Sequence, residues 1–262
     1  MTFALMRLAI SAGLARLTFT NGDKGNPIDG RFCNEMSEAA IQISEARDVR
    51  AVLIAAEGRS FSVGGDVKSL ADDLDALSLN IKRWTTTFHS AIARLQRMDA
   101  PIVAAVQGSC VGGMSGFIAG CDIVVSASDA RFIAAYAGIG FSCDASSSIT
   151  YSRRLGLGRA RRFLLLNETL AAQDALAAGL VDEVVRPEDL SRRAEEIVAH
   201  LAAGPTRAFG EIRRLLLSAA EQPLETQLEL EAQALARIGG SADAREGLTA
   251  FCEKRKPLFT DR

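Results

Sequence analysis

Hydrophobic residues along the chain form short runs typical of strands, which alternate with longer stretches at helical spacing. The runs at 6–10 and 14–20 flank a small-residue turn and predict a β-hairpin. Residues 21–30 are dense in turn formers and predict a loop. Residues 31–47 carry apolar positions at steps of three and four, which predicts an amphipathic helix.

Three further β-branched runs, 50–56, 101–106 and 123–126, predict buried strands in a parallel α/β arrangement. The first two lead into glycine pairs, Gly64-Gly65 and Gly112-Gly113, each followed by a helical pattern. Backbone N–H groups at a helix start lack helical partners, and glycine lets a ligand approach the backbone closely. Either turn alone is more typical of an ordinary strand-to-helix loop than of a binding site. Two such turns together can present two N–H groups to one carbonyl oxygen, which forms an oxyanion hole.

Residues 72–98 are predicted to be mostly helical, with one apolar stripe that packs in the core. That stripe consists of Trp84, Phe88, Ile92 and Leu95. His89 lies next to it, and we expect a structural or surface role because a lone histidine needs a partner to act as a catalyst. Residues 132–148 are predicted to be mainly loop.

Helical patterns at 157–166 and 171–178 precede a short predicted strand at 181–185, and Gly179 has the position of a glycine that ends a helix. From residue 187 the pattern becomes entirely helical. The predicted C-terminal helices span 188–203, 206–220, 224–238 and 242–254. We therefore divide the chain into an α/β core, 1–186, and an α-helical C-terminal region, 187–262, whose leucines are expected to pack on the core and on other copies of the chain.

Composition excludes several classes of protein. The 262 residues are 48% hydrophobic with a net charge of −2, so no broad basic surface indicates a nucleic-acid partner. The five cysteines form no C-x-x-C pair, which argues against a disulfide framework or zinc site and favours a reducing cytoplasm. We expect no membrane span, because no run of apolar residues is long enough.

Several motifs, in order along nearly the whole chain, resemble the crotonase superfamily of enoyl-CoA hydratases and isomerases. They are F-S-V-G-G-D-V-K (61–68), P-I-V-A-A-V-Q-G (101–108), C-D-I-V-V-S-A-S-D-A-R-F (121–132), A-A-Q-D-A-L-A-A-G-L-V-D-E-V-V (171–185) and A-F-C-E-K-R-K-P-L-F (250–259). Together they are far more specific than either glycine turn alone.

The resemblance implies an α/β fold, a crotonase-type spiral of ββα units followed by an α-helical C-terminal oligomerisation region. It implies a coenzyme A thioester as substrate and an oxyanion hole made by the N–H groups of Gly65 and Gly113. It also implies a homotrimer or a dimer of trimers. No metal or separate cofactor is expected, because coenzyme A is part of the substrate.

The resemblance further implies a set of substrate-binding residues. They are Asn26, Ile28, Val63, Gly64, Asp66, Val67, Lys68, Val111, Gly112, Ala135 and Tyr136. Lys68 could meet a CoA phosphate or be an ordinary solvated lysine, and Pro27 removes one N–H from the loop beside the CoA. Phe251 and Lys254 are expected to reach the CoA of a neighbouring subunit.

The chemistry differs from that of the related hydratases, which use two glutamates. At the matching positions this chain has Gly116 and Tyr136. Glycine has no proton to transfer, and tyrosine, with an ordinary pKa of about 10, is a poor base at neutral pH. A two-carboxylate hydration mechanism is therefore not expected.

One carboxylate remains at a family catalytic position. Asp144 matches the aspartate of the family segment G-L-x-P-D-x-G-G, among small and apolar residues that favour a base. The alternative is that Asp144 caps a helix beginning near Ala145. The segment is similar to that of the phenylacetate-pathway ring-epoxide isomerases, which implies an isomerase that moves a proton with Asp144.

Two other classes stay open. One is an enoyl-CoA hydratase of fatty-acid or aromatic-acid degradation, and another is a non-catalytic acyl-CoA-binding homologue. The segment also resembles 4-chlorobenzoyl-CoA dehalogenase, where the matching aspartate is a nucleophile assisted by a histidine and a tryptophan. We rank dehalogenation lower, because His89 is expected to be offset by about one helical turn and no tryptophan occupies the other position.

Overall fold

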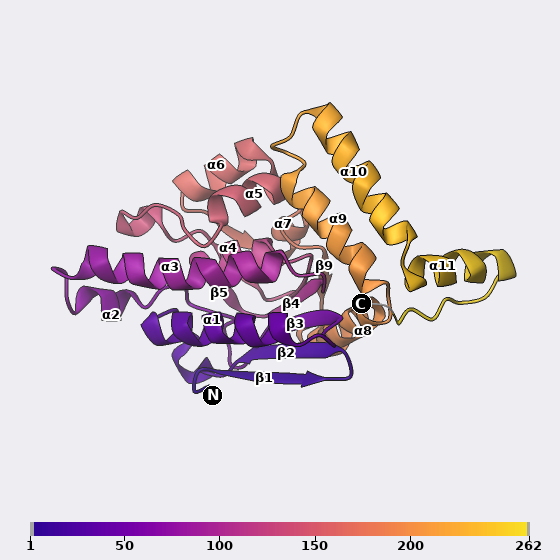
Figure 1. Ribbon diagram of the computed structural model, residues 1–262. Helices are drawn as coiled ribbons and strands as arrows, with labels where there is room; N and C mark the ends of the chain where they lie inside the picture. The colour runs from indigo at the N-terminus through magenta and orange to yellow at the C-terminus, as the bar shows by residue number, and fades with distance from the viewer. Residues whose placement is uncertain (1–2, 261–262) are drawn as a thin grey trace.

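The structure is a computed structural model that describes residues 3–260 (Figure 1). Its larger sheet has six strands in the order β1-β2-β3-β4-β6-β9. The strands are β1 (Met6–Ser11), β2 (Leu14–Phe19), β3 (Ala51–Ala56), β4 (Ile102–Val106), β6 (Ile123–Ala127) and β9 (Glu183–Val185). β1 and β2 form the predicted antiparallel hairpin, and every later pairing in this sheet is parallel, as predicted.

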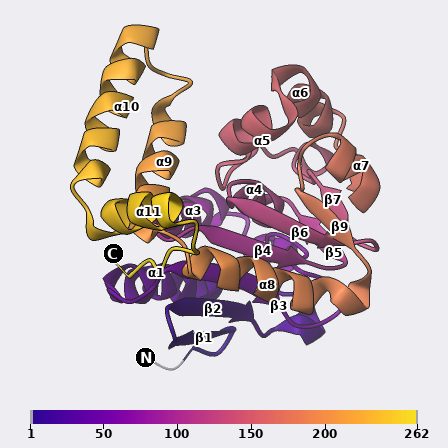
Figure 2. The ribbon, with the colours of Figure 1, turned by 90° about the vertical axis from the view of Figure 1, so that its right-hand side faces the viewer.

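The two faces of this sheet carry separate apolar clusters, because side chains alternate along each strand. Val52 and Ile54 of β3 face the main core, which also contains residues of α1 (Gly30–Glu45) and α3 (Leu77–Gln96). Ala51 and Leu53 face the opposite side and pack with α8 (Leu190–Ala202). The first helix of the C-terminal region thus covers one face of the α/β core, as Figure 2 shows.

A second, three-stranded sheet was not predicted. It consists of β5 (Ser109–Val111), β7 (Arg131–Ile133) and β8 (Thr169–Ala171). α4 (Gly113–Ala119) and α7 (Ala172–Ala177) contact this sheet, α5 (Ser147–Leu155) packs on α4, and α6 (Leu157–Leu165) packs on α5. Short 3-10 turns lie at Gly22–Lys24, Ala137–Ile139 and Pro187–Asp189. Each of these strands has three residues, too few for an alternating pattern to be recognised.

The long helix predicted from residue 72 is shorter in the structure. α2 (Val67–Ala71) ends there, and α3 begins only at Leu77. The intervening residues 72–76 include three aspartates, whose mutual repulsion and tendency to bond to the local backbone disfavour a helix.

The remaining C-terminal helices agree with the prediction within three residues at each end. They are α9 (Thr206–Ser218), α10 (Leu224–Gly239) and α11 (Ala242–Glu253). α10 packs beside α9, and α10 and α11 project away from the sheets (Figures 1 and 2). Several of their leucines are exposed, among them Leu224, Leu228, Leu235 and Leu248. Within residues 3–260, no helix has the length and apolar character needed to cross a membrane.

Candidate active site

The first glycine turn is pinned to the loop after β2 by backbone hydrogen bonds. Ile28 N donates to Gly64 O and Asp66 N donates to Ile28 O, both at 2.8 Å. Gly64 has a φ of +83°, and a Cβ there would lie 3.0 Å from the carbonyl oxygen of Val111, so the position requires glycine. Within residues 3–260, the N–H of Gly65 has no hydrogen-bond acceptor, and no atom lies within 4 Å of where a Cβ would stand.

The second glycine turn follows β5 and starts α4. Gly112 has a φ of +56°, and its N–H donates to Ile133 O at 2.9 Å. Gly113 is the first residue of α4, and its N–H likewise has no acceptor in the described part of the chain. A Cβ on Gly113 would lie 3.0 Å from Oδ1 of Asp144, so this amide and that carboxylate are neighbours.

The two turns are joined to each other and border one cavity of about 390 Å³. Ser62 N donates to Ser109 O at 2.9 Å, and Val111 N donates to Ser62 O at 3.1 Å. Of the predicted site residues, those that line the cavity are Ile28, Val63, Gly64, Gly65, Val67, Val111, Gly112, Gly113, Ala135, Tyr136 and Asp144. Residues far apart in sequence are thereby brought to one site.

Five predicted residues lie outside the lining of this cavity. Asn26 is buried and donates from Nδ2 to the carbonyl oxygens of Glu57 and Ser60, which holds the loop. Asp66 caps α2, since its Oδ1 accepts a hydrogen bond from Ser69 N at 3.2 Å. Lys68 is exposed, and Phe251 and Lys254 lie at the end of α11. Contacts of these five with CoA stay predictions.

One wall of the cavity comes from α3, and the sequence pattern had assigned it only to the core. Ile81, Trp84, Thr85 and Phe88 line the cavity. Phe88 is also buried and packs edge-to-face on Phe32. The helical stripe therefore serves both the core and the pocket. The lining is completed by Cys33, Leu70, Ile139, Gly140, Phe141 and Ser142.

Asp144 is held by Tyr136. The Tyr136 hydroxyl donates to Oδ1 of Asp144 at 2.8 Å and lies 2.9 Å from Oγ of Ser147. Burial, reinforced by the negative charge of Asp144, raises the pKa of Tyr136 far above its ordinary value. The phenol therefore stays protonated and acts as a donor.

The alternative that Asp144 caps a helix is wrong. α5 begins at Ser147, its N-cap residue is Ser146, and no side chain caps it. Two residues that are not glycine, Ala145 (φ +49°) and Ser146 (φ +67°), adopt left-handed conformations between Asp144 and this helix. The carboxylate of Asp144 thus remains directed at the cavity.

His89 is a neighbour of Asp144, and its half-exposed imidazole is bonded to a backbone amide, which agrees with the structural or surface role expected from the sequence. Its Nε2 accepts a hydrogen bond from Ala145 N at 2.9 Å and lies 3.9 Å from Oδ2 of Asp144. The sequence carried no signal for this contact, because it depends on how α3 packs across the loop before α5.

At the position of one hydratase glutamate, the backbone leaves no room for a side chain. A Cβ on Gly116 would lie 2.9 Å from Cβ and 3.0 Å from Cα of Ser147, and would overlap its Oγ. Thr150 Oγ1 also donates to Gly116 O at 3.0 Å, which fixes α5 against α4. The missing carboxylate is therefore replaced by helix packing.

The surroundings of the thiol in this cavity disfavour its nucleophilic form. Cys33 is buried, and burial raises the pKa of its thiol to about 12, with a further contribution from the charges of Asp29 and Asp144. The thiolate form required for attack is therefore scarce at neutral pH.

Comparison with known proteins shows the family and the fold. Residues 9–262 match the model of the enoyl-CoA hydratase/isomerase family, and the chain belongs to this family of enzymes. A crystal structure of an enoyl-CoA hydratase from Polaromonas superposes with a TM-score of 0.91 at 26% identity, covering 97% of this chain and 99% of the other. The expected crotonase-type fold with a helical C-terminal region is confirmed.

Related sequences have different activities. A protein of Rhodobacter capsulatus named "Probable enoyl-CoA hydratase" is 32% identical, covering 100% of both chains. The 1,2-epoxyphenylacetyl-CoA isomerase of Escherichia coli is 30% identical over 97% of both chains. A 4-chlorobenzoyl coenzyme A dehalogenase of an Arthrobacter species is 32% identical, covering 92% of this chain and 88% of the relative.

Proposed function

We propose that the chain is an acyl-CoA isomerase that moves a proton with a single base, Asp144. The observation that carries this proposal is the convergence on one cavity of a carboxylate and two N–H groups, from Gly65 and Gly113, that have no acceptor within residues 3–260. The positions of both hydratase glutamates lack a carboxylate, which favours isomerisation over hydration.

The proposed mechanism starts with the thioester oxygen. The N–H groups of Gly65 and Gly113 donate to this oxygen and stabilise the enolate that forms when a neighbouring C–H loses its proton. Asp144 takes that proton and returns it further along the acyl group. Because Tyr136 donates to Oδ1, the second oxygen, Oδ2, is the one left to accept the proton.

The acyl group is proposed to be apolar and unsaturated or cyclic. Trp84, Phe88 and Phe141 line a cavity of about 390 Å³ that also holds the two glycine turns. Aromatic walls favour flat or apolar groups. Incubating a panel of such CoA thioesters in D₂O, with mass spectrometry as the readout, would identify substrates by deuterium gained without a mass increase for water.

The direct test is Asp144→Asn. We expect turnover to fall by about 10²-fold or more while CoA-thioester affinity stays within a few-fold, because the amide cannot accept the proton. Asp129→Asn, a change at an exposed position, serves as the matched control. Wild-type kcat in Asp144→Asn would remove Asp144 as the base.

Two of the alternatives are separated by the same assays. A hydratase would add the mass of water to an enoyl-CoA, and here Asp144 would have to activate a bound water for that addition. A non-catalytic binder would hold the thioester without exchange at any position. We rank both below isomerisation, because the amides and a base lie together on one cavity.

The contact between His89 and Asp144 favours a second candidate, nucleophilic attack by Asp144 on a halogenated aromatic acyl group. Oδ2 of Asp144 would bond to the ring carbon, halide would leave, and water would then hydrolyse the aryl ester. A single turnover in H₂¹⁸O would place the label in the carboxyl group of Asp144 rather than in the product. Isomerisation labels neither, which separates the two candidates.

The C-terminal helices are proposed to assemble the chain into a trimer or a dimer of trimers in the cytoplasm. Apolar side chains on α10 and α11 are exposed, including Leu235 at 75% and Phe251 at 83%. Burying them against other copies would remove this surface from water. Sedimentation at micromolar concentration tests the assembly, and a fully active monomer of 27.9 kDa would exclude it.

A further inference from the structure

We propose that His89 is a positioning residue for Asp144, which acts by accepting the backbone N–H of Ala145. The proposal rests on the proposed function of Asp144, but one of its tests does not require activity. The contact that carries it is the 2.9 Å hydrogen bond from Ala145 N to Nε2 of His89.

The segment that this bond holds is strained. Ala145 and Ser146 are consecutive residues with φ of +49° and +67°, a region that side chains other than glycine rarely adopt. Such conformations persist only where surrounding contacts enforce them. Ala145 is fully buried, so its N–H needs an acceptor, and within residues 3–260 the imidazole is the only one.

The other hydrogen bonds of the segment hold different groups. Ser147 N donates to the carbonyl oxygen of Asp144 at 2.9 Å, and Oγ of Ser146 donates to Gly116 O at 3.4 Å. Neither involves the amide of the residue that directly follows the carboxylate. Tyr136 holds the carboxylate of Asp144 directly, and the imidazole of His89 holds the backbone of the strained turn that carries it.

This bond also defines the protonation state of His89. An amide N–H can only donate, so Nε2 carries the lone pair and the ring proton resides on Nδ1. A doubly protonated ring would lose the bond to Ala145. Its Nε2–H would then be drawn to the carboxylate oxygen Oδ2 of Asp144, which is 3.9 Å away. Protonation of His89 would thus release the strained turn and also place a hydrogen bond on Oδ2 of Asp144, the oxygen proposed to accept the proton.

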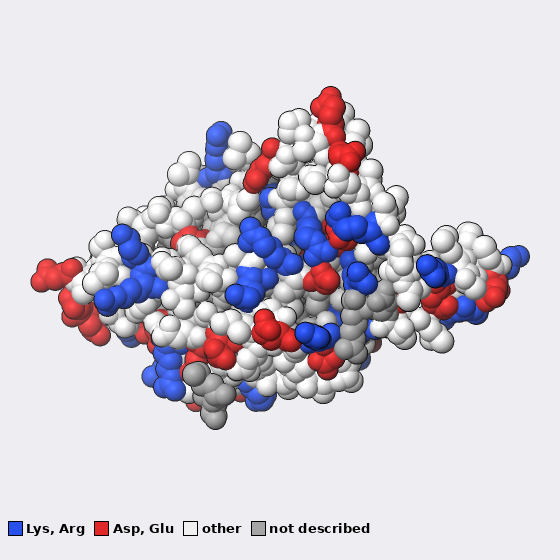
Figure 3. Space-filling model, in the orientation of Figure 1, with Lys and Arg blue, Asp and Glu red and all other residues white. Residues whose placement is uncertain are grey.

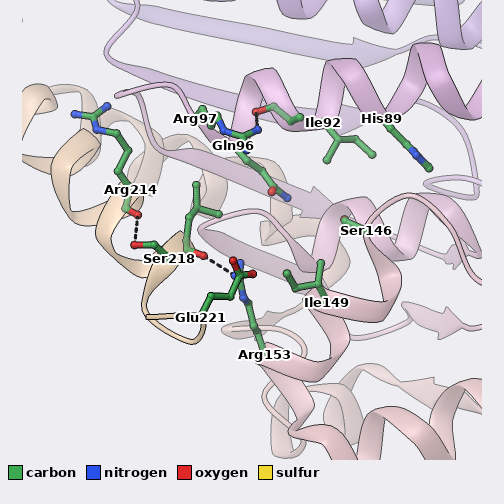
Figure 4. A pocket seen from close by; sticks show the side chains of 12 residues that line it. His89, Ile92, Gln96, Arg97, Ser146, Ile149, Arg153, Arg214, Ser218 and Glu221 are labelled. Atoms are coloured by element: carbon green, nitrogen blue, oxygen red, sulfur yellow. Dashed lines mark hydrogen bonds between the residues drawn. The ribbon is translucent and has the colours of Figure 1, made fainter. Parts of the chain in front are cut away.

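A second cavity gives His89 its own access to solvent. This cavity, of about 770 Å³, lies between α3, α5 and α9, and Figure 4 shows His89 at one end of it, near Ser146. The imidazole is 45% exposed. A proton can therefore reach His89 without crossing the substrate cavity, and the effect of acid should be seen in kcat as well as in kcat/KM.

The charges around His89 come from several elements. Asp144 faces it from the loop before α5, and the charged residues that line the second cavity are Arg97, Arg153, Arg214 and Glu221. Figure 3 shows blue side chains gathered where α3 meets α9. Arg214 is paired with Asp99 and Glu211, so part of this positive charge is compensated.

The activity test compares two variants that differ in one respect. His89→Gln keeps an acceptor that can reach Ala145 N, whereas His89→Leu removes it. We expect kcat of His89→Leu to fall at least about tenfold with little change in KM, and His89→Gln to keep most of the activity. His200→Leu, on the exposed face of α8, should behave as wild type. Equal losses in the two His89 variants, or a change in KM alone, would overturn the proposal.

The pH profile supplies a readout that simple packing would not move. Glutamine does not protonate, so the acid loss of kcat that His89 contributes should be absent from His89→Gln. If kcat of this variant fell at acid pH as steeply as kcat of the wild type, the proposed effect of His89 protonation would be contradicted.

The second test reads the tautomer directly. The chain has only two histidines, so ¹⁵N-imidazole spectra of a His200→Gln protein report His89 alone. At neutral pH we expect the Nδ1–H tautomer, and an Nε2–H tautomer would overturn the proposal. Because this measurement needs no substrate, it stays informative if Asp144 proves not to be the base.

Discussion

The two glycine turns have the same sequence pattern, in which a strand is followed by a glycine pair and then by a helix. Their surroundings in the structure differ. The first turn is open at its second glycine: no atom lies within 4 Å of a Cβ on Gly65, and the following α2 has five residues with only Leu70 buried. The second is enclosed: all seven residues of α4 are buried, and Gly113 abuts Asp144.

This difference assigns different tasks to the turns. The first contributes one backbone N–H to the cavity and little else. The second contributes an N–H and also abuts the base, because Asp144 and Ser147 lie directly against α4 and Tyr136 bonds to both of them. The same substitution, glycine to alanine, should therefore reduce activity by different amounts at the two turns.

The largest effect is expected for Gly113→Ala. Its Cβ would lie 3.0 Å from Oδ1 of Asp144 and 3.2 Å from Cβ of Ala145, so the base must shift. We expect kcat/KM to fall about 10²-fold, the scale of a small misplacement of a catalytic group. Steady-state kinetics on the substrate found by exchange would measure this, and a loss of less than about threefold would show that the enclosed turn tolerates change.

One turn of helix further on, Gly116→Ala tests the packing of the same helix. The new methyl group would meet Ser147 at 2.9 Å from its Cβ, so α5 must move. We expect a loss of about 1–3 kcal/mol in the free energy of unfolding. Gly158→Ala in α6 is the matched control, since nothing lies within 4 Å there. Equal thermal stability of the two variants would mean that α4 and α5 are not tightly packed.

Tyr136→Phe removes the donor to Asp144 while keeping the ring. A hydrogen bond to a charged group contributes about 1.5–3 kcal/mol, so we expect kcat to fall about tenfold, less than for Asp144→Asn. Measuring kcat of Tyr136→Phe and Asp144→Asn under the same conditions shows which variant loses more activity. A larger loss for Tyr136→Phe would make the phenol, rather than the carboxylate, the main catalytic group.

The same substitution changes stability at high pH. Because burial raises the pKa of Tyr136 in the folded state, its contribution is fully present below the ordinary tyrosine pKa of about 10 and declines as the pH rises above it. Denaturant unfolding from neutral to alkaline pH should show a steeper loss for wild type than for Tyr136→Phe. Parallel curves would mean that Tyr136 ionises equally in both states.

The sequence was sufficient for the regular elements and for the glycine turns. Buried strands and amphipathic helices follow from periodicity, and the four C-terminal helices were found because prolines and glycines separate them. The three strands of the smaller sheet, β5, β7 and β8, were missed, since their pairing depends on partners distant in the chain. The break before Leu77 was missed because apolar spacing continues across the aspartates.

The site was predicted only where motifs mark it. Gly65, Gly113 and Asp144 were named from the resemblance, and the structure brings them to one cavity. His89 and Trp84 could not be assigned there, since a helical stripe does not reveal which part of it faces a pocket. The direction of an imidazole towards a strained turn is a property of tertiary packing alone.

The smallest effect is expected for Gly65→Ala, the counterpart of Gly113→Ala at the open turn. Gly65 is not among the residues with positive φ, its N–H is retained, and the new methyl group meets no atom within 4 Å. We therefore expect kcat/KM within about threefold of wild type and an unchanged unfolding temperature. Kinetics of the two alanine variants, measured side by side, give the ratio that defines the asymmetry. If both variants lost activity to the same extent, the two turns would contribute equally, and the enclosed turn would carry no task beyond its N–H.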